Sequence, residues 1–400
     1  MLENRNMLCI SNSSWEGDYA KTIVELMSVF AKKNKVLYVD NPYTIKDLLD
    51  GIQKKKKIPF KRVLGFEKRL KKIATDYNSE IYVLMLPVTL TINFLPKGTL
   101  YNTLLNFNGW LITRSIRKYL KQLDMNHELI NITAFTPAIG MVTAGKFNEK
   151  LLIYHCYDAI EAATWLKKHG ADHEKEFMQV ADAVVVTSQG LLEKKSALAK
   201  ACYLVKNAAN INLFKSAFKQ ELTTKKVVGY IGSIDERLDY DLLSYAIGNT
   251  PAIQYVFIGR VVDKKGEQLL RKFPNVSFEG AKSLRDLPGY VKNFSLGIIP
   301  FAQNEFNKGI YPLKINEYLA AGLPVVSTNF SYLADFTDVI HISNTKEEFK
   351  NFIEQEIATD SLQKKQERLA VAVNNSWEQR VEQFSDIIKQ VEENKEKANP

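Results

Sequence analysis

Short runs of β-branched and other apolar residues alternate with segments of helical periodicity along most of this chain. This alternation constrains the fold most strongly, because repeated strand–helix units assemble into parallel sheets covered by helices. The chain contains two such series. The first predicts strands at 7–10, 36–39, 81–86, 130–135, 151–154 and 183–187, and the second at 226–231, 255–258, 276–278, 296–299 and 324–327.

The two series predict two doubly wound α/β domains, and a length of 400 residues is enough for two cores. Residues 1–205 would form the first domain and residues 206–375 the second, because a polar stretch separates the two series. Residues 376–400 are expected to form a C-terminal helix and tail. Sheets of this kind bind ligands beyond the carboxyl ends of their strands, so functional residues are expected in the loops after strands.

The cysteine content and the apolar segments exclude several classes of protein. Three cysteines without CxxC spacing support neither a disulfide framework nor a thiolate zinc site. The N-terminal residues contain no continuous apolar stretch typical of a signal peptide, and the apolar segment 81–96 is too short and too interrupted to cross a bilayer. We therefore expect a cytoplasmic protein that does not span a membrane.

The net charge of +9 comes from one segment. Residues 51–72 hold ten of the 54 basic residues and one of the 45 acidic residues, which leaves 44 of each elsewhere. Within 54–72 the cations alternate with apolar residues such as Phe60, Phe66 and Leu70. A solvated loop and a nucleic-acid site are both possible interpretations, but the alternation favours an anionic membrane surface. No aromatic RNA-binding run accompanies it, so nucleic acid is not the expected partner.

Residues 309–326 carry the most informative motif. Pro312 suits a first helical turn, Gly322 suits a helix end, and 324–327 opens the next strand. Lys314 and Glu317 are three residues apart, so they share a helical face near its N-terminus. A lysine there can bind a phosphate, and a carboxylate can accept two hydrogen bonds from a ribose diol, although a surface ion pair would leave the same pattern.

A polar loop follows the first strand of each series. Residues 11–18 contain one glycine and no GxGxxG, so they are not a dinucleotide fingerprint, and Asp18 suits a helix N-cap. In the second loop, Gly232 and Ser233 are followed by Arg237, an arrangement suited to an anion near a helix N-terminus. An arginine on a solvated loop is an equally good interpretation of Arg237.

The motif resembles retaining glycosyltransferases of family 4, which have the GT-B fold. The resemblance rests on Glu317, the run 320–326, Gly280 after 274–276, and Val205 with Asn207. It is good over 180–326, while weaker similarity at 11–47 and in the Trp377 helix resembles bacterial cell-surface polysaccharide transferases of the teichuronic-acid type. It implies two Rossmann-like domains facing a cleft, with the C-terminal helix crossing back to the first domain.

The resemblance also implies a donor site. Glu317 would hold the donor ribose, and Arg237 and Lys314 would hold the diphosphate. Gly232, Ser233, Gly309 and Tyr311 are assigned to the same site. The sequence departs from the family at two of these positions, because Gly309 stands where the family has its first glutamate and Ser233 stands where it has an arginine.

In the first domain, His155 and Asp158 follow the strand at 151–154. The resemblance places a histidine at this strand end against the donor sugar, so His155 is the catalytic candidate and Asp158 could orient it or the acceptor. A single histidine after a strand is also often structural. Ser14, Trp15 and Gly17 are assigned to an acceptor-side loop.

The sequence thus predicts a glycosyltransferase that moves a sugar, with retention, from a UDP- or GDP-sugar to a cell-envelope glycan or lipid-linked acceptor. The enzyme would work at the inner face of the cell membrane. No Asp-x-Asp pair or histidine cluster is present at the expected diphosphate, so neither a metal nor another cofactor is expected. Two alternatives stay open: a nucleotide-sugar 2-epimerase of the same fold, and an inactive sugar-nucleotide binding subunit.

Overall fold

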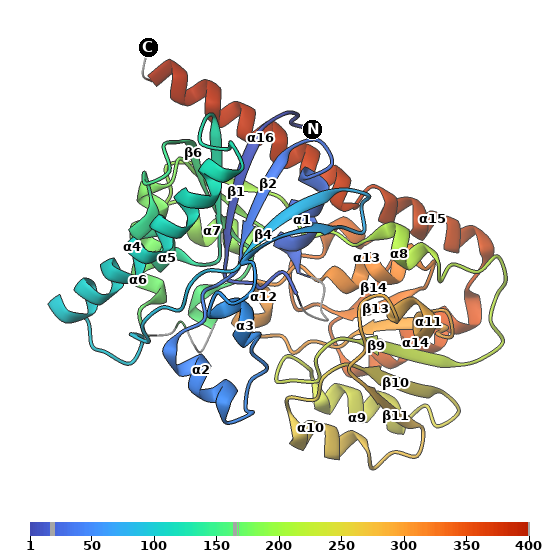
Figure 1. The fold of residues 1–400 in the computed structure, drawn as a ribbon. Coiled ribbons are helices and arrows are strands. Elements are labelled where there is room, and N and C mark those ends of the chain that lie inside the picture. The colour runs from blue at the N-terminus through green and yellow to red at the C-terminus, as the bar shows by residue number, and fades with distance from the viewer. Residues whose placement is uncertain (17–20, 163–165, 167, 399–400) are drawn as a thin grey trace. The chain divides into compact units, whose positions relative to one another are not determined.

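The computed structural model describes residues 1–16, 21–162, 166 and 168–398, and divides the chain into two compact units. The first unit contains the described residues within 1–16 and 21–205 together with residues 381–398. The second unit contains residues 206–380. Each unit is built around one sheet, and Figure 1 shows the elements of both.

The first unit contains an eight-stranded sheet in the order β3-β4-β2-β1-β5-β6-β7-β8. All neighbouring strands are parallel except β3 and β4, which pair in antiparallel register. The strands are β1 (Asn6–Ser11), β2 (Lys35–Val39), β3 (Leu70–Ala74), β4 (Glu80–Leu84), β5 (Leu129–Ala134), β6 (Glu149–Cys156), β7 (Ala183–Val186) and β8 (Cys202–Leu204).

Helices cover both faces of this sheet, as parallel strand–helix units require. One face packs against α4, where Ile112, Ile116 and Leu120 join Leu8 and Leu37 in one core cluster. The helices of this unit are α1 (Thr22–Phe30), α2 (Ile45–Ile52), α3 (Phe60–Val63), α4 (Thr99–Gln122), α5 (Pro137–Thr143), α6 (Gly170–Val180) and α7 (Gln189–Lys195), with a 3₁₀ turn at Ile160–Ala162.

The C-terminal helix α16 (Trp377–Ala398) begins in the second unit and ends in the first. Its Phe384 ring packs edge-on against Phe30 of α1, and the Ser385 hydroxyl accepts the backbone N–H of Leu2 at 3.1 Å. Near its end, Lys395 binds Asp182 at 2.8 Å. The two ends of the chain therefore complete the core of the same unit, as the sequence predicts for this helix.

The second unit contains a six-stranded sheet in the order β11-β10-β9-β12-β13-β14, in which all neighbouring strands are parallel. Its strands are β9 (Val227–Ile231), β10 (Gln254–Ile258), β11 (Val276–Gly280), β12 (Leu296–Ile299), β13 (Val325–Thr328) and β14 (His341–Ser343). Because all strands point the same way, the loops after β9, β10, β12 and β13 gather at one edge.

Two groups of helices cover the second sheet. Helices α9, α10 and α14 pack together on one face, and α8, α11, α13 and α15 on the other (Figure 1). The helices are α8 (Ile211–Lys215), α9 (Tyr240–Gly248), α10 (Lys264–Leu270), α11 (Leu287–Val291), α12 (Glu305–Lys308), α13 (Leu313–Ala320), α14 (Lys346–Thr359) and α15 (Leu362–Val373), with a 3₁₀ turn at Ala334–Phe336.

All eleven predicted strands are confirmed, and three further strands were not predicted. Strand β3 lies inside the basic segment, while β8 and β14 are three-residue strands at sheet edges. Among the described helices, none combines the length and the apolar character needed to cross a membrane.

Candidate functional site

A tight turn after β9 brings the backbone of the second unit to its carboxyl edge. Gly232 has a φ of +143°, in the region that favours glycine, and its N–H donates to the carbonyl of Ile258 at 2.8 Å. A Cβ on Gly259, which follows β10, would lie 1.8 Å from the Gly232 oxygen. The ends of β9 and β10 therefore approach so closely that only glycine fits at position 259.

Lys314 lies directly against this turn. A Cβ on Gly232 would lie 2.2 Å from Lys314 Cε and 3.0 Å from its Nζ, so the predicted loop residue and the predicted helix residue are in contact. Lys314 is the second residue of α13, and its ammonium lies near the rings of Tyr230 and Phe301. The sequence expectation that these residues share one site fits this geometry.

The pKa of the Lys314 ammonium is lower than that of a lysine in water. Burial, and to a smaller extent nearby Arg237, lower its pKa to about 8, although the carboxylates of Glu317 and Asp235 partly oppose these two effects. A lysine whose charge is disfavoured in this way gains most from an added anion. The first backbone N–H groups of α13 have no partner within the helix, and the N-cap residue Pro312 offers no side-chain hydrogen bond to them.

Glu317 is buried one helical turn after Lys314. Both residues are placed by the same short helix, which begins at Leu313 because Pro312 fixes an extended backbone before it. The site thus has a cation and, one turn along, a carboxylate. A diphosphate joined to a ribose presents the complementary pair of groups, an anion and a diol.

Arg237 is held by a carboxylate that the sequence analysis did not assign. Its Nε and Nη2 donate to the two carboxylate oxygens of Asp235 at 2.9 and 2.6 Å. The guanidinium also lies over the ring of Phe301 at 5.6 Å. An anion that recruits Arg237 must compete with Asp235 or share the guanidinium with it. In the sequence, the aspartate two residues before the arginine is the one feature that could have indicated this ion pair.

Ser233 and Tyr311 support the loops of this edge. The Ser233 carbonyl accepts the hydroxyl of Tyr230 at 3.0 Å. The Tyr311 side chain is buried beside Phe336, and its carbonyl accepts the amide of Asn207 at 3.1 Å. Tyr311 therefore anchors the segment before α13, and Asn207, which the sequence motif included, holds it.

Gly309 follows α12 with an ordinary φ of −78°. The nearest heavy atom to a Cβ added at this position would be the Phe306 carbonyl oxygen, at 3.8 Å. Neither backbone conformation nor space requires glycine here. The absence of the family glutamate is therefore a chemical difference of this chain and is not imposed by its packing.

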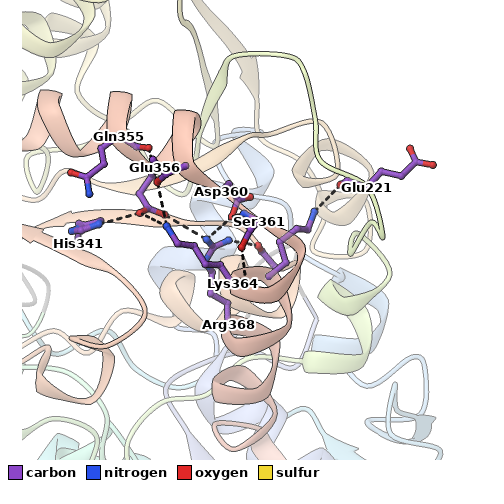
Figure 2. Close-up of polar contacts among 11 residues, drawn as sticks. Glu221, His341, Gln355, Glu356, Asp360, Ser361, Lys364 and Arg368 are labelled. Atoms are coloured by element: carbon purple, nitrogen blue, oxygen red, sulfur yellow. Dashed lines mark hydrogen bonds and ion pairs between the residues drawn. The ribbon is translucent and has the colours of Figure 1, made fainter.

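A polar network fixes the far end of α13 (Figure 2). Arg368 of α15 donates to the Gly322 carbonyl at 2.8 Å and to Asp360 at 2.6 Å. Glu356 lies within 3.5 Å of the same guanidinium and within 3.1 Å of His341 Nε2 on β14. Because Gly322 closes the turn after α13, this network limits movement of the helix that carries Lys314 and Glu317.

A cavity of about 360 Å³ opens at the same edge of the second sheet. It lies between the loop and helix after β12 and the loop after β13. Its walls present amide, hydroxyl and charged groups of the kind that bind hydroxyl-rich ligands. The lining residues include Gln303, Asn304, Glu305, Lys308, Asn329 and Ser331.

The carboxyl edge of the first unit is organised by Asp40, which the sequence analysis missed. Asp40 follows β2, and its carboxylate accepts the N–H of Trp15 at 2.7 Å. Burial raises its pKa to about 6, against the opposing effects of that hydrogen bond and of Arg62. Asp40 could have been predicted from the sequence, because it directly follows the strand expected at 36–39 and functional residues are expected after strands.

The predicted acceptor-side loop is placed around this carboxylate. The Trp15 ring packs edge-on against Tyr38, and the Ser14 carbonyl accepts the Lys21 ammonium. The loop is therefore held at Ser14 and Trp15 by contacts with the sheet and with the residue that precedes α1. Gly17, the third residue assigned to this loop, lies outside the described residues.

The structure corrects the expected surroundings of His155. The residue is in β6, but its side chain is fully buried on the sheet face covered by α16, with its ring 5.8 Å from that of Phe384. Among the described residues neither ring nitrogen has a hydrogen-bond partner, so the exposed Asp158 does not orient the ring. Burial lowers its pKa to about 3, so the ring is neutral at ordinary pH.

No group of three His, Cys, Asp or Glu side chains suited to a metal ion occurs among the described residues. Lys314 and Arg237 are the two cations that lie beside the turn after β9 at this edge. What this edge can do chemically is to bind an anion next to a hydroxyl-rich group and to stabilise negative charge that develops on that anion.

Comparisons with known proteins agree with this geometry. Residues 225–355 match the family model described as Glycosyl transferases group 1. A Bacillus subtilis (strain 168) protein named as a putative teichuronic acid biosynthesis glycosyltransferase, TuaH, is 33% identical over 170 residues. The match covers 39% of this chain and 42% of TuaH, so it spans less than half of that relative.

Solved structures resemble the whole chain. HepE of Anabaena in complex with UDP has a TM-score of 0.64 at 14% identity, and the match covers 96% of this chain and 100% of HepE. The catalytic domain of starch synthase IV from Arabidopsis thaliana, bound to ADP and acarbose, has a TM-score of 0.65 at 11% identity, with 98% and 100% covered. These likenesses confirm the two-domain GT-B fold expected from the sequence.

Proposed function

We propose that this chain, which has the GT-B fold and is related through its second unit to the glycosyl transferases group 1, transfers a sugar from a nucleotide sugar to an acceptor. One observation carries the proposal: Lys314 contacts the Gly232 turn, and Glu317 follows one helical turn later. Both residues lie within the segment matched by the family model.

The donor would bind at the carboxyl edge of the second sheet. Lys314 would meet the diphosphate, Arg237 would join it on leaving Asp235, and Glu317 would accept the ribose hydroxyls. Departure of a nucleoside diphosphate leaves negative charge behind, and fixed cations that meet that charge lower the barrier without a metal ion. HepE was crystallised with UDP and starch synthase IV with ADP, so the donor base is a question for experiment.

The acceptor that we propose is a cell-envelope glycan or a lipid-linked intermediate, in keeping with the name of the TuaH relative. Transfer would proceed with retention at the sugar carbon, on the cytoplasmic side of the membrane. The basic segment at 54–72 would place the first unit on an anionic lipid surface, where such acceptors are found.

A thermal-shift panel of UDP-, GDP- and ADP-sugars tests donor binding first. Each sugar that stabilises the protein is then incubated, in labelled form, with and without bacterial lipid extract. Transfer of label to lipid or glycan supports the proposal, and conversion of the free donor sugar without an acceptor identifies an epimerase instead. Binding without either reaction identifies a binding subunit. The glycine at position 309 and the Asp235–Arg237 ion pair are the two features that favour this alternative.

A further inference from the structure

Helix α2 is an unpartnered amphipathic element of the first unit. None of its eight residues is buried, although it contains Ile45, Leu49 and Ile52. These three side chains are 46, 54 and 68% exposed. Their spacing of four and three residues places them within an arc of about 60° on the helix, so they form one apolar ridge. An apolar ridge with this exposure indicates a surface that is covered in the working protein.

The other side of α2 is fixed to the body of the unit. A Cβ on Gly51 would lie 2.6 Å from Ile58 and 2.8 Å from Phe60, so this side packs directly on the following segment. Thr44 and Asp47 form a capping box at the helix start. The backbone N–H of Ile45 donates to the Thr89 carbonyl at 3.1 Å. The ridge is therefore held outward by a defined framework.

Exposed cations border this ridge. Lys54, Lys55, Lys56 and Lys57 directly follow α2, and all four are exposed. Lys56 binds Asp47 at 2.5 Å, whereas the other three have no ion pair among the described residues. Phe66, which follows α3, is 82% exposed. Apolar side chains flanked by lysines are the chemistry of a helix that lies in an anionic lipid interface.

The structure also distinguishes these lysines from two other cations of the basic segment, Arg62 and Lys72. Arg62 is buried, and its Nη2 donates to the carbonyls of Arg69 and Val83 at 3.0 and 3.1 Å. Lys72 lies on β3 and pairs with Glu80 of β4. These two cations stabilise the segment itself, whereas the lysines at its beginning and the region of Phe66 are exposed.

We propose that the apolar ridge of α2 inserts into the headgroup region of an anionic membrane, with Lys54–Lys57 contacting lipid phosphates. This inference rests on the membrane surface that is part of the proposed function. It makes that surface more specific, because the inserted residues belong to α2 and precede the basic segment 54–72. The occupant is a lipid surface because the ridge is bordered by a lysine run, which would disfavour a second copy of the same basic patch.

Flotation with phosphatidylglycerol or phosphatidylcholine vesicles, without any nucleotide sugar, tests this inference independently of donor binding. The wild-type chain should float with phosphatidylglycerol only. The triple change Ile45→Ser, Leu49→Ser and Ile52→Ser should lower the bound fraction at least tenfold even at low salt. Changing Lys54 to Lys57 to glutamine should cause a similar loss and remove the salt dependence.

A matched control is the triple change Leu222→Ser, Leu362→Ser and Val373→Ser, which alters three similarly exposed apolar side chains of the second unit. This control should float as the wild type does, and circular dichroism of all variants checks that they fold. A polarity-sensitive dye attached at Ile52→Cys, in a chain with Cys202→Ser, should shift to shorter wavelength with vesicles, whereas the dye at Leu222→Cys should not.

Two results would overturn the inference. One is unchanged flotation of the triple α2 variant together with an unshifted dye at position 52. The other is a wild-type dimer in light scattering that the α2 changes dissociate, which would show that a second copy covers the ridge. In either case a nucleotide sugar bound by the second unit would leave the proposed function standing.

Discussion

The carboxyl edges of the two sheets each contain an ionisable group whose charge is disfavoured by its surroundings, but the two charges are of opposite sign and have different neighbours. In the second unit, burial lowers the pKa of Lys314 to about 8, and two carboxylates and an arginine surround it. In the first unit, burial raises the pKa of Asp40 to about 6, and a backbone N–H and Arg62 face it. Burial disfavours the charged form in both places.

The two groups differ in whether a neighbouring group already stabilises their charge. Asp40 already accepts a short hydrogen bond from the Trp15 backbone, so it organises a loop of its own unit. Lys314 contacts glycine and aromatic rings, and the nearby Arg237 is occupied by Asp235. The second edge therefore gains more from an added anion than the first, which is why we place the donor there.

Removing the Lys314 ammonium should have the largest effect. Lys314→Ala should weaken nucleotide-sugar binding about 100-fold, because a charge-assisted contact to the diphosphate is lost at a desolvated site. In the wild type, affinity should fall as pH rises through about 8, since the lysine loses its proton there. Calorimetry on both sides of this pH checks both statements, and equal affinity at acidic and alkaline pH would contradict the role of Lys314.

Glu317→Ala should weaken binding of the same donor by about 1 to 3 kcal/mol, because the ribose hydroxyls lose a charged acceptor. Glu367→Ala, which removes an exposed carboxylate of α15 in the same unit, is the control and should bind the donor as the wild type does. If both variants bind the donor as tightly as the wild type does, the ribose contact is wrong.

Asp40→Asn tests the edge of the first unit through stability. A carboxyl pKa raised from 3.8 to about 6 contributes stability that is fully present below 3.8 and is lost as pH rises through about 6. The variant should therefore gain up to about 3 kcal/mol relative to the wild type between acidic and neutral pH. Urea unfolding at both pH values measures this, with the exposed Asp241→Asn as control. If the difference in unfolding free energy between Asp40→Asn and the wild type is the same at both pH values, burial does not raise the pKa of Asp40.

Gly309→Glu should fold with a change of less than about 0.5 kcal/mol in unfolding free energy, because the backbone is ordinary and the space is open. Restoring the glutamate of the related family should also alter which donor sugar binds best in the thermal-shift panel. A large loss of stability would show that position 309 is packed more tightly than the geometry indicates.

Chelation should have the smallest effect. Transfer activity should be the same, within error, with and without EDTA, since Lys314 and Arg237 are the cations proposed to meet the diphosphate. Titrating Mg²⁺ or Mn²⁺ back into EDTA-treated enzyme is the measurement. Complete loss of activity with recovery on adding metal would reverse the proposal of metal independence.

The sheets could be predicted well where apolar runs are long and buried. Strand β3 was missed because Leu70–Ala74 contains two lysines that are exposed on an edge strand. Lys314 could be paired with Glu317 because helical spacing alone places them on one face. The ion pair between Asp235 and Arg237 was not predicted: the spacing of two residues allows it, but the irregular turn between them decides whether it forms.

His155 shows a different limit. Its place at the end of a strand is readable from the sequence, but the strand extends to Cys156, and alternate residues of a strand point to opposite faces. The helix that covers the His155 side of the sheet contributes Phe384, which lies far along the chain. The three-dimensional arrangement was therefore needed to show that the ring is buried under α16.

A crystal structure of the chain with a nucleotide sugar selected by the thermal-shift panel tests the central claim most directly. We expect the diphosphate within hydrogen-bonding distance of Lys314 Nζ and the ribose hydroxyls at the Glu317 carboxylate. We also expect Arg237 to contact the diphosphate. A nucleotide bound elsewhere in the second unit, or at Asp40 and Trp15 in the first, would contradict the account.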